Sequence, residues 1–185
     1  KKATPTFNFK VLGKKKLFNS KGKFLIIFGP LHTNGLPVLD LAAQEKKNFE
    51  YSVEFVKNLS PEIRNETIGR PSWSKQYSLE KPYFEKLKNS NIKMDYGNQP
   101  LKNLLKKTRL TFFNYDSTGI LEHLALNIPT VCHWNNTFGS INSKFLELYE
   151  MLIKAKILFK ETDSLIKHVE TNWNNIDDWW MDQST

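Results

Sequence analysis

The feature that most constrains the fold is an alternation of short apolar runs with stretches of helical spacing. Lys23–Phe28 is apolar after its lysine and is closed by Gly29 and Pro30, as expected for a strand buried on both faces. Arg109–Tyr115 and Pro129–Trp134 are also rich in strand-forming residues, and the helical pattern Thr118–Asn127 separates them. This order predicts an α/β fold, a Rossmann-like parallel sheet flanked by helices, with any ligand beyond the carboxyl ends of the strands.

The same patterns place the remaining elements. We expect two further short strands, at Thr67–Ser72 and Ile92–Tyr96. We expect helices at about Gln44–Asn58, from Pro61, and at Pro82–Asn89, Leu101–Lys107, Asn142–Lys156 and Ser164–Asn175. The closing segment Trp173–Trp180 is predicted to be a helix end and tail that packs its aromatic rings onto the domain.

Length and cysteine content limit the class of protein. A chain of 185 residues with 39% hydrophobic residues suits one globular domain with a substantial core. No apolar run approaches the roughly 20 residues that a membrane-spanning helix needs, and no secretory signal is visible. The single cysteine, Cys132, excludes an internal disulfide and is expected in the core. A cytoplasmic setting follows, and the Lys1 start suggests a piece of a longer protein.

The net charge of +8 is confined to the start of the chain. Residues 1–23 hold eight lysines and no acid, whereas the remaining 19 basic residues are balanced by all 19 acidic ones. We therefore divide the chain into a basic arm, residues 1–23, and a neutral domain, residues 24–185. The arm is either a linker or strand of a neighbouring domain, or an electrostatic patch for an anionic surface. Because the domain itself is neutral, nucleic acid is disfavoured as a partner.

The most informative stretch runs from Asn114 to Glu122, between a strand end and a helix start. Ser117 and Thr118 are competent helix N-caps, and Gly119 allows a ligand to approach the backbone closely. A helix start at the carboxyl edge of a parallel sheet favours a bound phosphate. The alternative interpretation is a well-capped helix with no ligand.

Glu122 strengthens the interpretation as a binding site. It lies four residues after Thr118, on the same helix face, whereas a capping box requires a spacing of three. Its carboxylate could accept hydrogen bonds from ribose hydroxyls. The alternative is a favourable interaction with the helix dipole, worth roughly 0.3–1 kcal/mol.

Other candidates carry less information. His32 and Asn34, in the loop after the first strand, could meet a ligand at the same sheet edge, but the loop is also an ordinary turn. Arg70 and Lys75 could bind phosphate or could be a solvated pair. The sequence has no G-x-S-x-G, G-x-G-x-x-G or Walker A motif and no histidine spacing for a metal. We predict no metal and no cofactor.

The stretch from Asp116 to Thr130 resembles the donor-binding half of GT-B glycosyltransferases. The resemblance is closest to a bacterial family of surface-carbohydrate (O-antigen-type) transferases, and it covers most of residues 24–181. That family has P-E-x-I-R, S-R-L, L-E-x-L-A-L-N-I-P-T and W-x-x-I-x-x-W-W segments. They appear here as Pro61–Arg64, Thr108–Leu110, Leu121–Thr130 and Trp173–Trp180. The first lacks one residue before Ile63, and Thr108 replaces a serine in the second.

The resemblance implies one half of a GT-B enzyme that binds a nucleotide-sugar. It implies phosphate contacts for Arg70, Ser117, Thr118 and Gly119, and ribose or sugar contact for Glu122. It also implies that a loop containing Gly97, Asn98 and Leu101 lies near the nucleobase. The first-strand loop, 29–35, does not match the family.

The resemblance also has implications beyond the donor site. An N-terminal acceptor-binding domain would be missing from this chain, which leaves the catalytic residue unknown. Similar enzymes work at the inner membrane face, so the arm could make peripheral membrane contact. A nucleotide-sugar epimerase, a polyol-phosphate transferase and a non-catalytic module with a basic arm remain as alternative hypotheses.

Overall fold

The computed structural model describes residues 18–29, 39–71, 81–134 and 143–182. Within them, six strands form one parallel sheet in the order β3-β2-β1-β4-β5-β6. The strands are β1 (Lys23–Phe28), β2 (Thr67–Pro71), β3 (Lys93–Met94), β4 (Thr108–Phe113), β5 (Thr130–His133) and β6 (Leu158–Phe159). The predicted α/β class, with a Rossmann-like parallel sheet, is confirmed.

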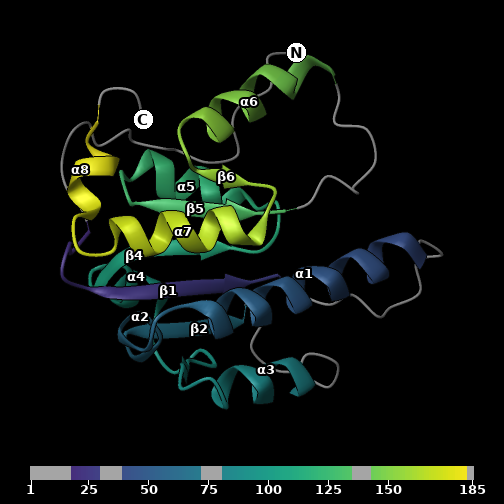
Figure 1. Ribbon diagram of the computed structural model, residues 1–185, viewed down its shortest axis with the longest axis vertical. Helices are drawn as coiled ribbons and strands as arrows, with labels where there is room; N and C mark the ends of the chain where they lie inside the picture. Colours follow the sequence, from purple (N-terminus) through teal and green to yellow (C-terminus); the bar gives the residue numbers. More distant parts are fainter. Residues whose placement is uncertain (1–17, 30–38, 72–80, 135–142, 183–185) are drawn as a thin grey trace.

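Helices cover both faces of this sheet, and α1 and α7 lie in front of it in the view of Figure 1. The helices are α1 (Leu39–Asn58), α2 (Pro61–Asn65), α3 (Lys81–Lys88), α4 (Leu101–Leu105), α5 (Thr118–Ala125), α6 (Leu146–Lys154), α7 (Thr162–Asn172) and α8 (Ile176–Trp180). A 3-10 turn, Ser143–Phe145, precedes α6.

Alternation along the central strands decides which side chains meet which helices. Phe24 of β1 contacts Phe55 of α1, and Phe112 of β4 also packs on Phe55. The residues that alternate with Phe24 along β1 and with Phe112 along β4 point to the opposite face of the sheet. Thr111 bonds His123 of α5 on that opposite face. Both faces are therefore apolar and buried, which is why the sequence shows continuous apolar runs at these strands.

The predicted elements agree with the structure in kind and differ at their ends. β1 has the predicted bounds, whereas α1 begins five residues before the expected Gln44. The strand expected at Ile92–Tyr96 contains only Lys93 and Met94. It ends there because the Asp95 carboxylate accepts a hydrogen bond from the Asn98 N–H and turns the chain out of the sheet.

Two elements were not predicted. β6 has two residues and follows Lys156, whose φ of 57° makes a tight turn after α6. α8 forms within the segment expected to be a tail. The predicted packing of aromatic rings there is confirmed, because Trp173 and Trp180 are buried.

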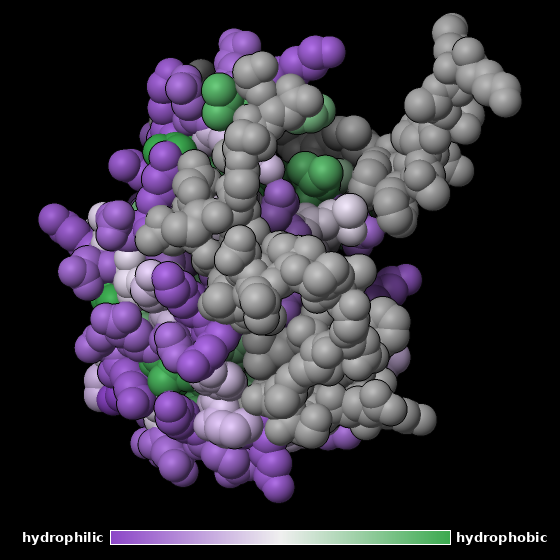
Figure 2. Space-filling view, turned by 90° about the vertical axis from the view of Figure 1, so that its right-hand side faces the viewer, coloured by the Kyte–Doolittle hydropathy of each residue, from purple (hydrophilic) through white to green (hydrophobic). Residues whose placement is uncertain are grey.

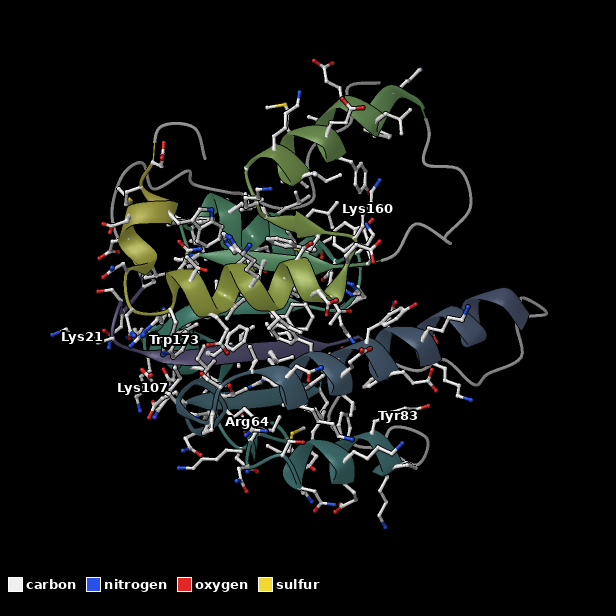
Figure 3. The ribbon with its side chains drawn as sticks, in the orientation of Figure 1. Lys21, Arg64, Tyr83, Lys107, Lys160 and Trp173 are labelled. Carbon is white, nitrogen blue, oxygen red and sulfur yellow. The ribbon has the colours of Figure 1, made fainter. Side chains whose placement is uncertain are left out.

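The described end of the basic arm packs on the domain. Phe18 is buried, and the Asn19 N–H donates to the Thr108 carbonyl. The Lys23 N–H donates to the Lys107 carbonyl, so the arm joins β1 beside the start of β4. Figure 3 places Lys21, Lys107 and Trp173 together at this end of the sheet and Lys160, which follows β6, at the other.

Candidate functional site

The centre of the carboxyl edge lies between β1 and β4, where the strand order reverses. Ligands of doubly wound folds bind at this point. Here Asn114, the first residue after β4, is buried, and its Oδ1 accepts a hydrogen bond of 2.9 Å from the Gly29 N–H. This bond ties together the ends of the two central strands. Figure 2 shows the molecule from the side of this edge, and most of the described residues visible from there are hydrophilic.

Gly29 is required at this position by close packing. A Cβ atom on Gly29 would lie 2.8 Å from the ring of Tyr115, a distance that real side chains do not adopt. The Tyr115 ring in turn contacts the Phe113 ring, with centroids 6.3 Å apart. The backbone of the strand end is therefore fixed directly beside the start of α5.

Helix α5 begins as predicted, with Ser117 as its N-cap. The Ser117 Oγ accepts a hydrogen bond of 3.0 Å from the Gly119 N–H, and its carbonyl accepts from the Ile120 N–H. A serine hydroxyl that accepts one bond still carries its own hydrogen. Ser117 can therefore cap the helix and donate to a bound anion.

The residues around this cap have the arrangement that the sequence predicted. Thr118 is exposed at the first helical position, and Glu122 is half-buried one turn later on the same face. Within the described residues, the Glu122 carboxylate forms no ion pair. A Cβ on Gly119 would lie 3.0 Å from the Phe113 ring, so this glycine lets the helix start approach the strand closely.

Asp116 connects this turn to α6, a contact that sequence reasoning missed. The Tyr149 hydroxyl donates to Asp116 Oδ2 at 2.9 Å. Burial, together with this bond to a carboxylate, raises the pKa of Tyr149 to about 12. The Tyr149 ring also contacts Trp134, which follows β5, with centroids 6.1 Å apart. The contact joins residues 33 positions apart, and no local pattern could reveal it.

Arg70 lies two strands away, on β2, and is bound to protein partners. Its Nη1 is 2.8 Å from Asp95 Oδ2 and 2.8 Å from the Gln99 carbonyl oxygen. By alternation along β1, β2 and β4, Arg70 points to the same face of the sheet as Ile27 and Phe113, the face that α5 covers. Two strand spacings put it roughly 10 Å from the β4 end.

The predicted site residues thus fall into two groups on one edge and one face. Arg70 lies against the loop that contains Gly97, Asn98 and Leu101 at the start of α4. Ser117, Thr118, Gly119 and Glu122 lie together at the start of α5. The candidates His32, Asn34 and Lys75 lie outside the described residues.

Beneath α5 lies a buried polar network. His123 Nδ1 is 3.0 Å from the Thr111 hydroxyl, which in turn lies 2.8 Å from the Thr130 hydroxyl. Burial lowers the pKa of His123 to about 4, so the imidazole is neutral at physiological pH. Cys132 is fully buried in β5, as predicted, and burial raises its pKa. These buried groups pack α5 against β4 and β5, and a ligand cannot reach them.

Among the described residues we find neither a membrane-spanning helix nor a metal-binding cluster. Their helices include none with the length and apolarity that crossing a bilayer requires. Nor do they contain three or more His, Cys, Asp or Glu side chains grouped so that they could bind a metal.

The fold and this edge define a Rossmann-like domain with a polar helix start at the point where the strand order reverses. Comparison with protein families shows which class of protein this domain belongs to. The chain belongs to a family of transferases. The matching model is that of the LIC12162 family transferase, and it covers residues 2–185. Comparison with curated proteins gives no match. Comparison with solved structures also gives none. The match includes most of the basic arm, so the arm belongs to the sequence that defines the family.

Proposed function

We propose that this transferase chain is the donor-binding half of a glycosyltransferase of surface carbohydrate synthesis and that it binds a nucleotide-sugar. The observation that carries the proposal is the start of α5. There a serine cap and an exposed threonine begin the helix at the point where the strand order reverses, and a half-buried glutamate lies one turn later on the same face. A transferase family, a doubly wound sheet and this turn together favour a phosphorylated donor.

In this proposal the diphosphate lies against the first turn of α5. The positive end of the helix dipole and the hydroxyls of Ser117 and Thr118 would bind the phosphate oxygens. Gly119 keeps the backbone accessible. Asp116 is also close, but its Oδ2 is bonded to Tyr149, which holds this carboxylate toward α6.

Glu122 would bind the ribose of the donor. A carboxylate accepts two hydrogen bonds from neighbouring hydroxyl groups, and a ribose presents two on one side. Glu122 lies one turn beyond the phosphate-binding turn, so a ligand that extends along the helix can reach both. The resemblance to GT-B enzymes assigns the same role to this position.

The proposed reaction transfers the sugar from the diphosphate to an acceptor hydroxyl. The bond between the anomeric carbon and the diphosphate oxygen breaks, and an acceptor hydroxyl oxygen bonds to that carbon and loses its proton. The helix start stabilises the negative charge that develops on the departing diphosphate. A second, acceptor-binding domain would supply the acceptor and the base.

We further propose that the basic arm contacts an anionic membrane surface. The arm contributes eight lysines, and its described end lies beside the exposed Lys106 and Lys107. Lysines near an anionic bilayer contribute roughly 1 kcal/mol each. Co-sedimentation with vesicles containing phosphatidylglycerol should detect binding that weakens with added salt, whereas neutral vesicles should show none.

The donor proposal is tested by titrating the chain with UDP, CDP, GDP and CMP under NMR observation. We expect one of the diphosphates to bind, and Glu122→Gln to weaken it about tenfold, the effect of roughly 1.4 kcal/mol. Glu147→Gln is the matched control, because Glu147 is an exposed glutamate of α6. The proposal fails if none of the four ligands binds, or if both variants bind like the wild type.

A further inference from the structure

The loop between β3 and α4 has little secondary structure of its own to hold it. It contains Gly97, whose φ is 89°, and the exposed Asn98. Pro100 stands at the N-cap position of α4 and forms no side-chain capping bond. A segment of this kind adopts a single conformation only when neighbouring groups fix it.

Asp95 and Arg70 are those groups. Asp95 Oδ1 accepts a 2.9 Å bond from the Asn98 N–H, and Asp95 Oδ2 lies 2.8 Å from Arg70 Nη1. The same Nη1 is 2.8 Å from the Gln99 carbonyl oxygen. The Asp95 N–H donates to the Gly69 carbonyl, which anchors the aspartate to β2. Four bonds thus fix both sides of one short turn.

This pairing changes what Arg70 can contribute to ligand binding. Only 18% of the Arg70 side chain and 8% of the Asp95 side chain are exposed. The guanidinium charge is balanced at 2.8 Å by a buried carboxylate, and the Nη1 group is already bonded twice. An arginine compensated in this way has less attraction left for a phosphate than an unpaired one.

We infer that Arg70 is a positioning residue that acts through Asp95 and Gln99. It holds the loop 96–101 so that the loop contacts the nucleobase, and it does not hold the diphosphate. This inference rests on the proposed donor site and on the nucleobase contact that the resemblance to GT-B enzymes implies for this loop. It separates recognition into two parts, with the phosphates bound at α5 and the base bound at the start of α4, three strands away.

The test compares two ligands, the nucleoside diphosphate that binds best and inorganic pyrophosphate. For Arg70→Gln we expect about tenfold weaker binding of the nucleotide and less than a twofold change for pyrophosphate. Equal losses for both ligands would show that Arg70 binds phosphate and would overturn the inference. Unchanged nucleotide binding would overturn it as well. Lys46→Gln, which breaks the exposed pair with Glu50 on α1, is the control.

Further variants keep the test decisive if Arg70→Gln folds poorly. Gly97→Ala strains the loop at its positive φ without touching the Arg70–Asp95 pair, and should give the same selective loss. Asp95→Asn should match Arg70→Gln, and the double variant should be no weaker than either single one, because the two residues act as a unit. Additive losses would contradict this.

Amide hydrogen exchange supplies a readout that needs no ligand. The Asn98 N–H should exchange at least tenfold faster in Arg70→Lys than in the wild type, because a lysine cannot reproduce the arginine's planar contacts. Unchanged exchange would overturn the positioning role.

If the wild type binds pyrophosphate and nucleotides equally, the base contact is wrong while the phosphate site stands. If it binds neither, the donor proposal itself fails.

Discussion

The two edges of the sheet are built differently. At the edge where the strands begin, charged groups pair with each other and with aromatic rings. Arg109 lies 4.1 Å from the centre of the Trp173 ring and donates to the Trp173 carbonyl, and Lys23 pairs with Glu66. At the edge where the strands end, the exposed Thr118 and half-buried Glu122 face outward at a helix start. The first edge holds the fold together, and the second carries the candidate site.

This contrast predicts that substitutions at the two edges affect different properties. At the beginning edge they should change the free energy of unfolding and leave ligand affinity unchanged in the molecules that remain folded. At the ending edge, substitutions of exposed residues should do the reverse, whereas substitutions of the buried residues beneath them should also lower the free energy of unfolding. Four experiments test this contrast.

The largest effect is expected for Trp173→Ala. The side chain is 2% exposed and also packs on Phe24, with centroids 6.1 Å apart. Its truncation leaves a cavity and removes the ring under Arg109, so the free energy of unfolding should fall by about 3–5 kcal/mol. Denaturant unfolding measures this. Phe145→Ala is the control, because Phe145 is 51% exposed and should change stability far less.

The next effect is a loss of stability in acid. His123 has its pKa lowered to about 4 in the fold, whereas an unfolded histidine titrates near 6.5. As the pH falls through 6.5, the unfolded chain binds the proton first, so the stability present above pH 6.5 is lost on the way to pH 4. His123 should account for roughly 3 kcal/mol of this loss. In His123→Gln the dependence on pH should be shallower by that amount, and an identical slope would contradict the assignment.

An intermediate effect is expected for Asn114→Ala, which sharpens the contrast. Asn114 lies at the ending edge, yet it is buried and its role is to accept the Gly29 N–H. Leaving that buried donor unpaired should cost about 1–3 kcal/mol of stability. Because the strand ends also support α5, nucleotide binding should weaken in parallel. A change in binding alone would show that Asn114 contacts the ligand directly.

The smallest effect on stability is expected for Thr118→Val. Thr118 is exposed, so the free energy of unfolding should change by less than about 0.5 kcal/mol. Loss of the hydroxyl should still weaken nucleotide and pyrophosphate binding several-fold. Paired measurement of thermal unfolding and affinity checks both expectations. A stability loss without an affinity loss would place Thr118 with the structural residues.

Local patterns were sufficient to predict the parts of the fold that local physics determines. β1 is a continuous apolar run closed by glycine and proline, and α5 begins at a serine cap, so both were located from the sequence. β6 has two residues, too few for any periodicity. α8 has five and was expected to be part of a tail.

In the candidate site too, contiguous residues could be predicted and contacts between distant residues could not. The start of α5 is a contiguous stretch and could be predicted as one unit. The partnership of Arg70 with Asp95 joins β2 to the residue that follows β3, 25 positions away, and that of Tyr149 with Asp116 joins residues 33 apart. Such pairs depend on the order of strands in the sheet and on the packing of helices against it. An aspartate directly after a short strand and two residues before a glycine was the available hint of a turn there.

The contact between Trp134 and Tyr149 gives this protein a built-in optical probe. Trp134 is 4% exposed, and Tyr149 joins it to Asp116 beside the predicted phosphate turn. Trp173 packs on Phe24 where the strands begin, and Trp179 and Trp180 contact each other at α8 on the same side of the molecule, whereas the turn lies where the strands end (Figures 1 and 3). With the other tryptophans replaced by phenylalanine, the remaining emission would come from the indole beside the turn. Occupancy of the turn could then be followed in real time without a label.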